Sequence, residues 1–248
     1  MWMQIRQVQA RLFPQKLPLL KTLEYTGTCI QARLVGGDYY DFLELRPGRM
    51  AFVLADIAGK GVSGALLMAN LQANLRSQYA LALDDLPRLL KSVNQLFYEN
   101  TAESSYATVF FGDYDDASRR LRYANCGHLP PLLLRAALTT GEEISAAPKV
   151  ETLRATSTVV GLFEKWQCEI AEVGFAPGDT LVLYTDGVTE AANAAGEQFG
   201  EDRLLDTLKR CSHLPVEPLL QSVVSAVQQF DGGQQQDDIT LLIARSLA

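Results

Sequence analysis

Three almost continuous apolar runs constrain the fold of this chain more than any other feature of its sequence. They are MAFVLADI at 50–57, TLVLY at 180–184 and ITLLIA at 239–244. Short runs of this kind, rich in Val, Ile and Leu and bounded by turn residues, are typical of strands that are buried on both faces. We therefore expect sheets in the interior of the protein, covered by other layers.

The other patterns divide into helices and shorter strands. Apolar stripes predict helices at about 63–83, 86–98, 203–210 and 216–230. Strand patterns lie at 29–35, 107–114, 119–124, 131–135 and 166–175, and 136–155 is irregular. Because several strands follow one another directly, we expect antiparallel pairing. The predicted fold class is an α+β layered sandwich with the helices outside, rather than a doubly wound parallel sheet.

Size and charge limit the classes of protein that this chain can represent. Its 248 residues, 48% of them hydrophobic, can bury the core of one large domain. A net charge of -7 argues against a nucleic-acid partner, which is bound by clustered Lys and Arg. No secretory signal and no apolar stretch of about 18 residues is visible, so we expect a cytoplasmic protein without a membrane span. The cysteines, 29, 126, 168 and 211, show no zinc spacing and are expected to be reduced thiols.

Acidic residues lie at the ends of the apolar strands. Asp38 follows two glycines, Asp56 ends the first run, Asp186 follows the second, and Asp237 precedes the third together with Asp238. A buried carboxylate is costly unless a positive group or a hydrogen-bond donor meets it. Each acid alone is explained by a turn or a helix cap. Together they predict a site for a hard cation such as Mg²⁺ or Mn²⁺, which prefers oxygen ligands.

Glycines accompany these acids. Gly36 and Gly37 precede Asp38, and Gly187 follows Asp186. A glycine lets the backbone turn sharply and lets a bulky group approach closely. The three glycines are candidate substrate-binding residues, although simple turn geometry also explains them.

The combined motifs resemble the bacterial PP2C-type serine phosphatases of the SpoIIE and RsbU kind. The matching segments are VGGDYYDF, LADIAGKGVSGALLMA, RYANCGHLPPLLL, PGDTLVLYTDGVTEAANAAGEQFGEDRL and DDITLLIA, which start at 35, 54, 122, 177 and 237. The resemblance extends over nearly the whole chain from about residue 12. It implies an αββα four-layer sandwich with two central antiparallel sheets and two Mn²⁺ or Mg²⁺ ions at one edge.

The resemblance also implies a role for each site residue. Asp56 would bridge both metals, the backbone carbonyl of Ile57 would bind one of them, and Asp186 and Asp237 would hold the other. Asp38 would help to hold the cluster. A water activated by the two cations would attack the phosphorus directly, so Asp56 and Asp186 would be catalytic through the water that the metals hold. Mn²⁺ and Mg²⁺ are both compatible with an oxygen-only site.

Two histidine positions bear on the chemistry. Eukaryotic relatives place a histidine two residues after the bridging acid, whereas this chain has Ala58 there. His128 is the other candidate for an acid catalyst, but a lone histidine beside Pro130 and Pro131 is expected to be a strand-end residue bonded to the backbone.

The resemblance implies the partners as well. The expected substrate is a phosphorylated STAS-type anti-sigma-factor antagonist, and a sensor or receiver domain precedes the phosphatase domain in similar proteins. Residues 1–16 have the helical spacing of a linker end, and 17–248 would form the phosphatase domain. The helix could pair with a second copy to form a homodimer or pack on its own domain. The alternative function is a partner-switching binding module of the same fold that no longer catalyses turnover.

Overall fold

Two five-stranded antiparallel sheets form the centre of the protein. The computed structural model describes residues 2–81, 85–102, 104–136 and 149–248. One sheet, here the β10 sheet, has the order β1-β10-β9-β6-β7, and the other, the β3 sheet, has the order β2-β3-β4-β5-β8. The strands are β1 (Leu23–Ile30), β2 (Tyr39–Arg46), β3 (Arg49–Ile57), β4 (Ala107–Asp115), β5 (Arg120–Cys126), β6 (Leu132–Leu134), β7 (Val150–Thr152), β8 (Ala171–Gly174), β9 (Thr180–Tyr184) and β10 (Ile239–Ser246).

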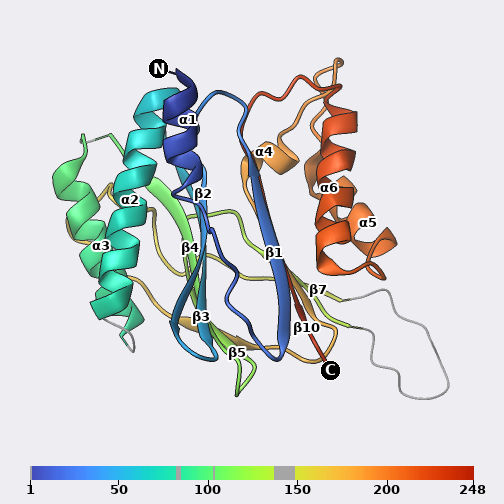
Figure 1. Cartoon of the computed structure of the whole chain (residues 1–248), viewed down its shortest axis with the longest axis horizontal. Helices are drawn as coiled ribbons and strands as arrows, with labels where there is room; N and C mark the ends of the chain where they lie inside the picture. The colour runs from blue at the N-terminus through green and yellow to red at the C-terminus, as the bar shows by residue number, and fades with distance from the viewer. Residues whose placement is uncertain (1, 82–84, 103, 137–148) are drawn as a thin grey trace.

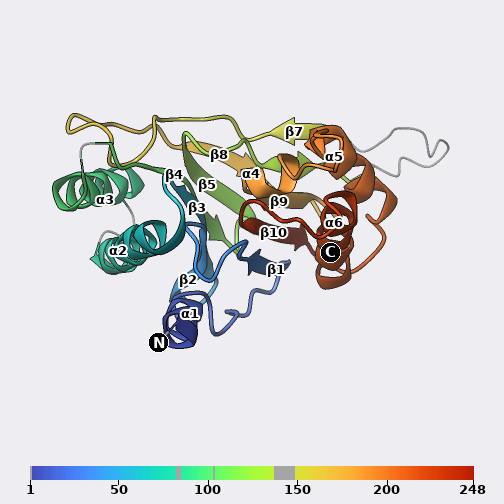
Figure 2. The same ribbon diagram turned by 90° about the horizontal axis from the view of Figure 1, so that it is seen from above.

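Helices cover the outer faces of both sheets, so the layers follow the order helix, sheet, sheet, helix (Figures 1 and 2). On the β3 sheet lie α2 (Gly61–Leu81) and α3 (Leu86–Asn100). On the β10 sheet lie α5 (Gly200–Arg210) and α6 (Val216–Phe230). The short α4 (Asp186–Thr189) follows β9 directly. The predicted αββα sandwich with antiparallel sheets is confirmed.

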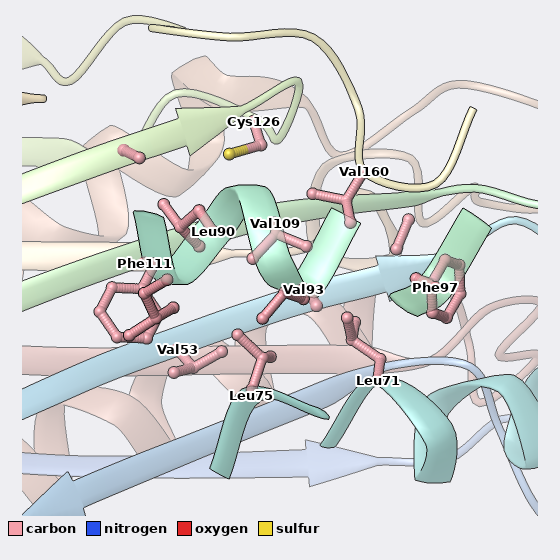
Figure 3. Packing of buried hydrophobic residues seen from close by; sticks show 14 of the residues in the cluster. Val53, Leu71, Leu75, Leu90, Val93, Phe97, Val109, Phe111, Cys126 and Val160 are labelled. Carbon is pink, nitrogen blue, oxygen red and sulfur yellow. The ribbon is translucent and has the colours of Figure 1, made fainter. Parts of the chain in front are cut away.

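Three apolar clusters hold the four layers together. Figure 3 shows the cluster between the β3 sheet and its helices. Leu71 and Leu75 of α2 and Phe97 of α3 pack there over Val53 and Phe111 of the sheet. A second cluster fills the space between the sheets, and a third lies under α5 and α6. Each central strand therefore contributes apolar side chains to two clusters, which explains the continuous apolar runs.

The sequence patterns located most elements within a few residues. The runs at 50–57, 180–184 and 239–244 correspond to β3, β9 and β10, and the four predicted helices correspond to α2, α3, α5 and α6. The predicted strand at 29–35 is misplaced, because β1 spans Leu23–Ile30 and pairs with β10 along its whole length. The predicted strand at 166–175 is reduced to β8, and β7 lies within the segment 136–155 that was expected to be irregular. Residues 137–148 of that segment lie outside the described residues.

The sequence pattern did not predict strand β2, because a charged residue lies inside this strand. Asp41 is fully buried, and the guanidinium of Arg76 on α2 donates to both of its carboxylate oxygens at 2.7 and 2.9 Å. The phenol of Tyr39 donates to the same carboxylate at 2.5 Å. A buried charge with this set of donors is tolerated in a strand, although it interrupts the apolar pattern.

The N-terminal segment packs on the domain. In α1 (Trp2–Ala10), the side-chain amide of Gln9 donates to the carbonyl of Gly36 at 2.7 Å and accepts from the amide of Gly36 at 3.2 Å. The ring of Phe13 lies 5.4 Å from that of Tyr40. The predicted linker helix thus contacts the loop that precedes β2, and a homodimer through this helix stays a prediction. No helix in the described ranges has both the length and the apolar character needed to cross a membrane.

The packing of α2 gives a test of the fold. Replacing the fully buried Leu75 with alanine should lower the free energy of unfolding by about 2–5 kcal/mol, because the surrounding core closes only partly around the cavity. Leu66 on the same helix is 67% exposed, and Leu66→Ala should cost less than about 0.5 kcal/mol. Urea unfolding measures both changes. Equal losses would contradict the orientation of α2.

Candidate metal centre

The predicted acidic residues come together at one end of the two sheets. Asp56 is the penultimate residue of β3, and Asp38 precedes the neighbouring β2. Asp186 follows β9, and Asp237 lies just before the neighbouring β10. Because neighbouring strands are antiparallel, the end of one lies beside the start of the next (Figure 1). Residues that are far apart in the sequence therefore meet at the edge between the sheets.

Asp38 is buried and held by hydroxyl groups of the opposite sheet. Thr185 donates to its Oδ2 at 2.7 Å, and the hydroxyl of Thr240 donates to the same oxygen. Burial, followed by the nearby charge of Asp56, raises the pKa of Asp38 well above its ordinary value. The carboxylate thus connects the start of β2 to the end of β9 and the start of β10.

Asp56 and Asp186 are only partly buried. Burial and then the charges of Asp186 and Asp237 raise the pKa of Asp56 to about 7. Burial and then the charge of Asp237 raise the pKa of Asp186. Each carboxylate therefore experiences the negative charge of the others, which a cation between them would relieve.

The two adjacent acids before β10 point in different directions. Asp237 is the more exposed, and the ammonium of Lys60 donates to its Oδ2 at 2.5 Å. Asp238 is buried, and its Oδ1 accepts from the backbone amide of Ala32 at 2.9 Å. Asp237 is therefore available at the surface, whereas Asp238 holds the loop before β2.

The candidate substrate-binding glycines are packed against this backbone. A Cβ atom on Gly36 would lie 1.7 Å from Oδ2 of Asp238, and one on Gly187 would lie 2.0 Å from the carbonyl oxygen of Asp238. A Cβ atom on Gly37 would approach the carbonyl oxygen of Ile57 to 3.1 Å. Close packing accounts for all three glycines. A contact with substrate stays a prediction.

A small pocket opens at this edge and combines acidic and basic side chains. Asp56, Asp237 and Asp238 line it together with Arg33 and Lys60, and we call it the acidic pocket. Its carboxylate oxygens are the donors that Mg²⁺ and Mn²⁺ prefer, so the donor chemistry fits a divalent cation. Within the part of the chain that the structure describes, no three His, Cys, Asp or Glu side chains are already arranged as a group that could hold a metal ion. The cation would therefore draw the carboxylates together.

His128 is fully engaged between the two sheets. Its Nε2 lies 3.2 Å from the carbonyl oxygen of Tyr184, which can only accept, so Nε2 carries the hydrogen. Its Nδ1 then accepts from the hydroxyl of Thr108 at 2.9 Å. Burial lowers the pKa of His128 to about 4. The ring is a neutral link to the backbone, as the sequence indicated.

The model of one known family covers most of the chain. The family described as stage II sporulation protein E (SpoIIE) matches residues 46–246. The chain belongs to the SpoIIE family. This match confirms the resemblance to PP2C-type phosphatases that the sequence motifs indicated. It also confirms, at the level of the family, the prediction of a protein phosphatase.

Two curated relatives align with almost all of this SpoIIE-family chain. Protein IcfG of Synechocystis sp. is 29% identical over 263 residues, which cover 96% of the chain and 40% of IcfG. The phosphoserine phosphatase RsbU of Bacillus subtilis is 26% identical over 247 residues, which cover 96% of the chain and 68% of RsbU. The chain thus spans less than half of the first relative and about two thirds of the second.

Solved structures of low sequence identity share the fold. The SiaA-PP2C domain of Pseudomonas aeruginosa superposes with a TM-score of 0.81 at 23% identity and covers 98% of this chain, which in turn covers 94% of that domain. The catalytic domain of the serine/threonine phosphatase PstP, determined in complex with two manganese ions, gives a TM-score of 0.65 at 15% identity. The superposition covers 92% of this chain and 99% of the PstP domain.

Sequence reasoning missed several residues of the SpoIIE-family site. Thr185 and Thr240 bind Asp38, and Lys60 and Arg33 bring positive charge to the acidic pocket. The threonines lie one residue before Asp186 and two residues after Asp238, so their proximity to acids at strand ends was the available signal. No signal in the sequence pointed to Lys60, because its partner Asp237 is 177 residues away and only the folded loop before α2 brings the two together.

The crowded carboxylates predict how stability depends on pH. A carboxyl group whose pKa is higher in the folded state than in the unfolded state stabilises the fold at low pH, and this contribution is lost as the pH rises. With cations chelated, the free energy of unfolding should fall between about pH 4 and about pH 7, the range between the ordinary and the raised pKa of Asp56. Urea unfolding across this range measures the slope.

A pair of variants assigns this slope to the site. Asp56→Asn should make the slope shallower, because the amide does not ionise and Asp38 loses a neighbouring charge, whereas Asp206→Asn at an exposed position of α5 should leave it unchanged. A slope that is the same in Asp56→Asn as in the unmodified protein would show that other groups cause it.

Proposed function

We propose that this protein is a metal-dependent protein serine/threonine phosphatase. The observation that carries the proposal is the meeting of acids from four strand ends, two in each sheet. Asp56 and Asp237 line the acidic pocket, and Asp38 and Asp186 lie close enough to Asp56 for their charges to interact with it. Burial and mutual repulsion raise the pKa of Asp56 and Asp186 there, which is typical of a site built for cations. The acids also match the family motifs by position.

The proposed metal ligands come from the edge where the sheets meet. Asp56 would bridge two divalent cations, the carbonyl of Ile57 would bind one, and Asp186 and Asp237 would bind the other. Asp38 would hold the cluster through its contacts with the threonines of the other sheet. Bound cations supply Lewis acidity, which activates a water for attack on phosphorus and neutralises the phosphoryl oxygens. Mn²⁺ is supported by the fold relative that holds two manganese ions, and Mg²⁺ suits the same oxygen donors.

The rim of the acidic pocket would position the phosphoryl group. Arg33 and Lys60 both line the pocket and carry the positive charge that a phosphate dianion requires. Lys60 is 55% exposed at the side chain and has a long flexible stem, so it can exchange Asp237 for a phosphoryl oxygen. His128 is bonded through both ring nitrogens, which leaves protonation of the serine leaving group to solvent.

The proposed substrate is a phosphoserine or phosphothreonine on a regulatory protein. The similarity to RsbU, which is named a phosphoserine phosphatase, supports a phosphoserine substrate. The regulatory protein that we propose is a STAS-type anti-sigma-factor antagonist, as the motif resemblance implies. The motifs resemble a family in which a sensor or receiver domain precedes the phosphatase domain, so we also propose such an upstream domain in the whole protein. The contact of Gln9 with Gly36 gives such a domain a path to the site.

Turnover of a phosphoserine STAS-domain protein tests the function. Asp56→Asn should lower kcat by about 100-fold or more in the presence of Mn²⁺, because the variant loses several kcal/mol of charge stabilisation. Asp186→Asn and Asp237→Asn should lose activity similarly, and Asp206→Asn is the matched control on an exposed surface. Activity that needs no divalent cation, or full activity in Asp56→Asn, would refute the metal mechanism. Tight substrate binding without turnover would favour the non-catalytic binding module.

A further inference from the structure

A second pocket lies on the other side of Asp237. It shares Lys60, Gln236 and Asp237 with the acidic pocket, so the two pockets adjoin. Asp231, at the end of α6, is one of its lining residues, and we call it the Asp231 pocket. A ligand in the acidic pocket could therefore extend directly into it.

The carboxylate of Asp231 is poorly compensated. The side chain is 5% exposed, and its Oδ1 accepts from the amide of Gly233 at 2.7 Å. Its Oδ2 is buried and has no hydrogen-bond partner among the described residues. A buried polar atom without a partner costs free energy and requires an explanation.

The position of Asp231 makes this cost larger. The residue is the C-cap of α6, a helix of 15 residues with no basic residue in its last turn. A helix C-terminus carries partial negative charge, so a carboxylate there is repelled rather than stabilised. Both observations indicate a carboxylate that is suited to meet a cation from outside the domain.

The walls of the Asp231 pocket define the kind of cation. Glu190 and Asp237 add two further carboxylates, and among the described residues that line the pocket Lys60 is the one basic side chain. Gly187, Ala191 and Ala192 supply a wall of small groups without charge. Small uncharged groups beside several carboxylates suit a side chain with an apolar stem and a cationic head, which is the structure of arginine and lysine.

We propose that the Asp231 pocket binds an arginine or lysine side chain of the phosphorylated protein substrate while the phosphoserine occupies the acidic pocket. Arginine fits best, because its planar guanidinium can donate to Asp231 and Glu190 together. Gly232 and Gly233 directly after Asp231 are exposed and have φ values of +64° and +79°, and binding at the buried Oδ2 requires a shift of this turn that exposes it. This inference rests on the proposed phosphatase function and adds a specificity site to it.

Binding and turnover of a phosphopeptide series test the proposal. Each peptide carries one phosphoserine and a single arginine at one of the flanking positions, and the reference peptide has alanine at all of them. With Mn²⁺ present and a non-hydrolysable phosphonate in place of the phosphoserine, fluorescence anisotropy should show about tenfold tighter binding for one arginine position, the gain expected of a charge-assisted hydrogen bond. With Mn²⁺, kcat/KM should show the same preference.

Two variants assign the preference to the pocket. Asp231→Asn keeps the shape of the side chain and should remove most of the arginine preference. Its kcat/KM should fall about tenfold more for the preferred arginine peptide than for p-nitrophenyl phosphate, which has no arginine. Glu190→Gln, at an exposed position, should weaken the preference without affecting folding. Asp206→Asn is the charge-matched control. Asp231→Asn should also raise Tm by about 1–3 °C, because the unpaired charge disappears.

The outcomes separate this inference from the phosphatase proposal. Absence of turnover together with an arginine preference in binding that Asp231→Asn removes would refute the phosphatase function and keep the pocket. Turnover without preference for any arginine position, a preference that survives in Asp231→Asn, or a fall in Tm in that variant would overturn the inference. Isothermal titration calorimetry counts the Mn²⁺ ions that each variant binds. If Asp231→Asn binds one Mn²⁺ fewer than the unmodified protein, the Asp231 pocket is a metal site, and the inference of an arginine site is overturned as well.

Discussion

The hydrogen bonds from Thr185 and Thr240 to the buried carboxylate of Asp38 hold the two sheets together at the end where the acids gather. Asp38 belongs to the β3 sheet side, and both threonines belong to the β10 sheet side. Burial raises the pKa of this carboxyl group, and the hydrogen bonds from the opposite sheet oppose that rise by favouring its charged form. This bond set therefore holds the end of β3, which carries Asp56, near the end of β9, which Asp186 follows.

Close backbone packing completes this arrangement. Gly36 and Gly187 let the chain approach Asp238 to distances at which any side chain would collide with it. The amide of Gln9 ties α1 to the same loop through Gly36. The position of the site edge therefore depends on the fold of the whole domain, including its N-terminal helix. Neither sheet alone could bring the acids together.

Much of the fold was predictable because each central strand packs on both faces. That packing produces the continuous apolar runs of β3, β9 and β10, and amphipathic stripes mark the helices that cover them. Strand β2 was not predictable in the same way, because Asp41 depends on Arg76, a partner 35 residues away. The acids of the site were found from their place at strand ends. Lys60 was not, because its contact with Asp237 joins residues 177 positions apart. Asp231 was not, because its buried oxygen without a partner and its place in a pocket exist only in the folded chain.

Anomalous diffraction from crystals grown with Mn²⁺ tests the central claim most directly. Two manganese peaks should lie at the edge between the sheets, with Asp56 in contact with both, Asp186 and Asp237 in contact with one, and Asp38 still bound to its threonines. Manganese that binds only at other places, or a pair of ions that Asp56 does not touch, would contradict the assignment of this edge as the metal centre.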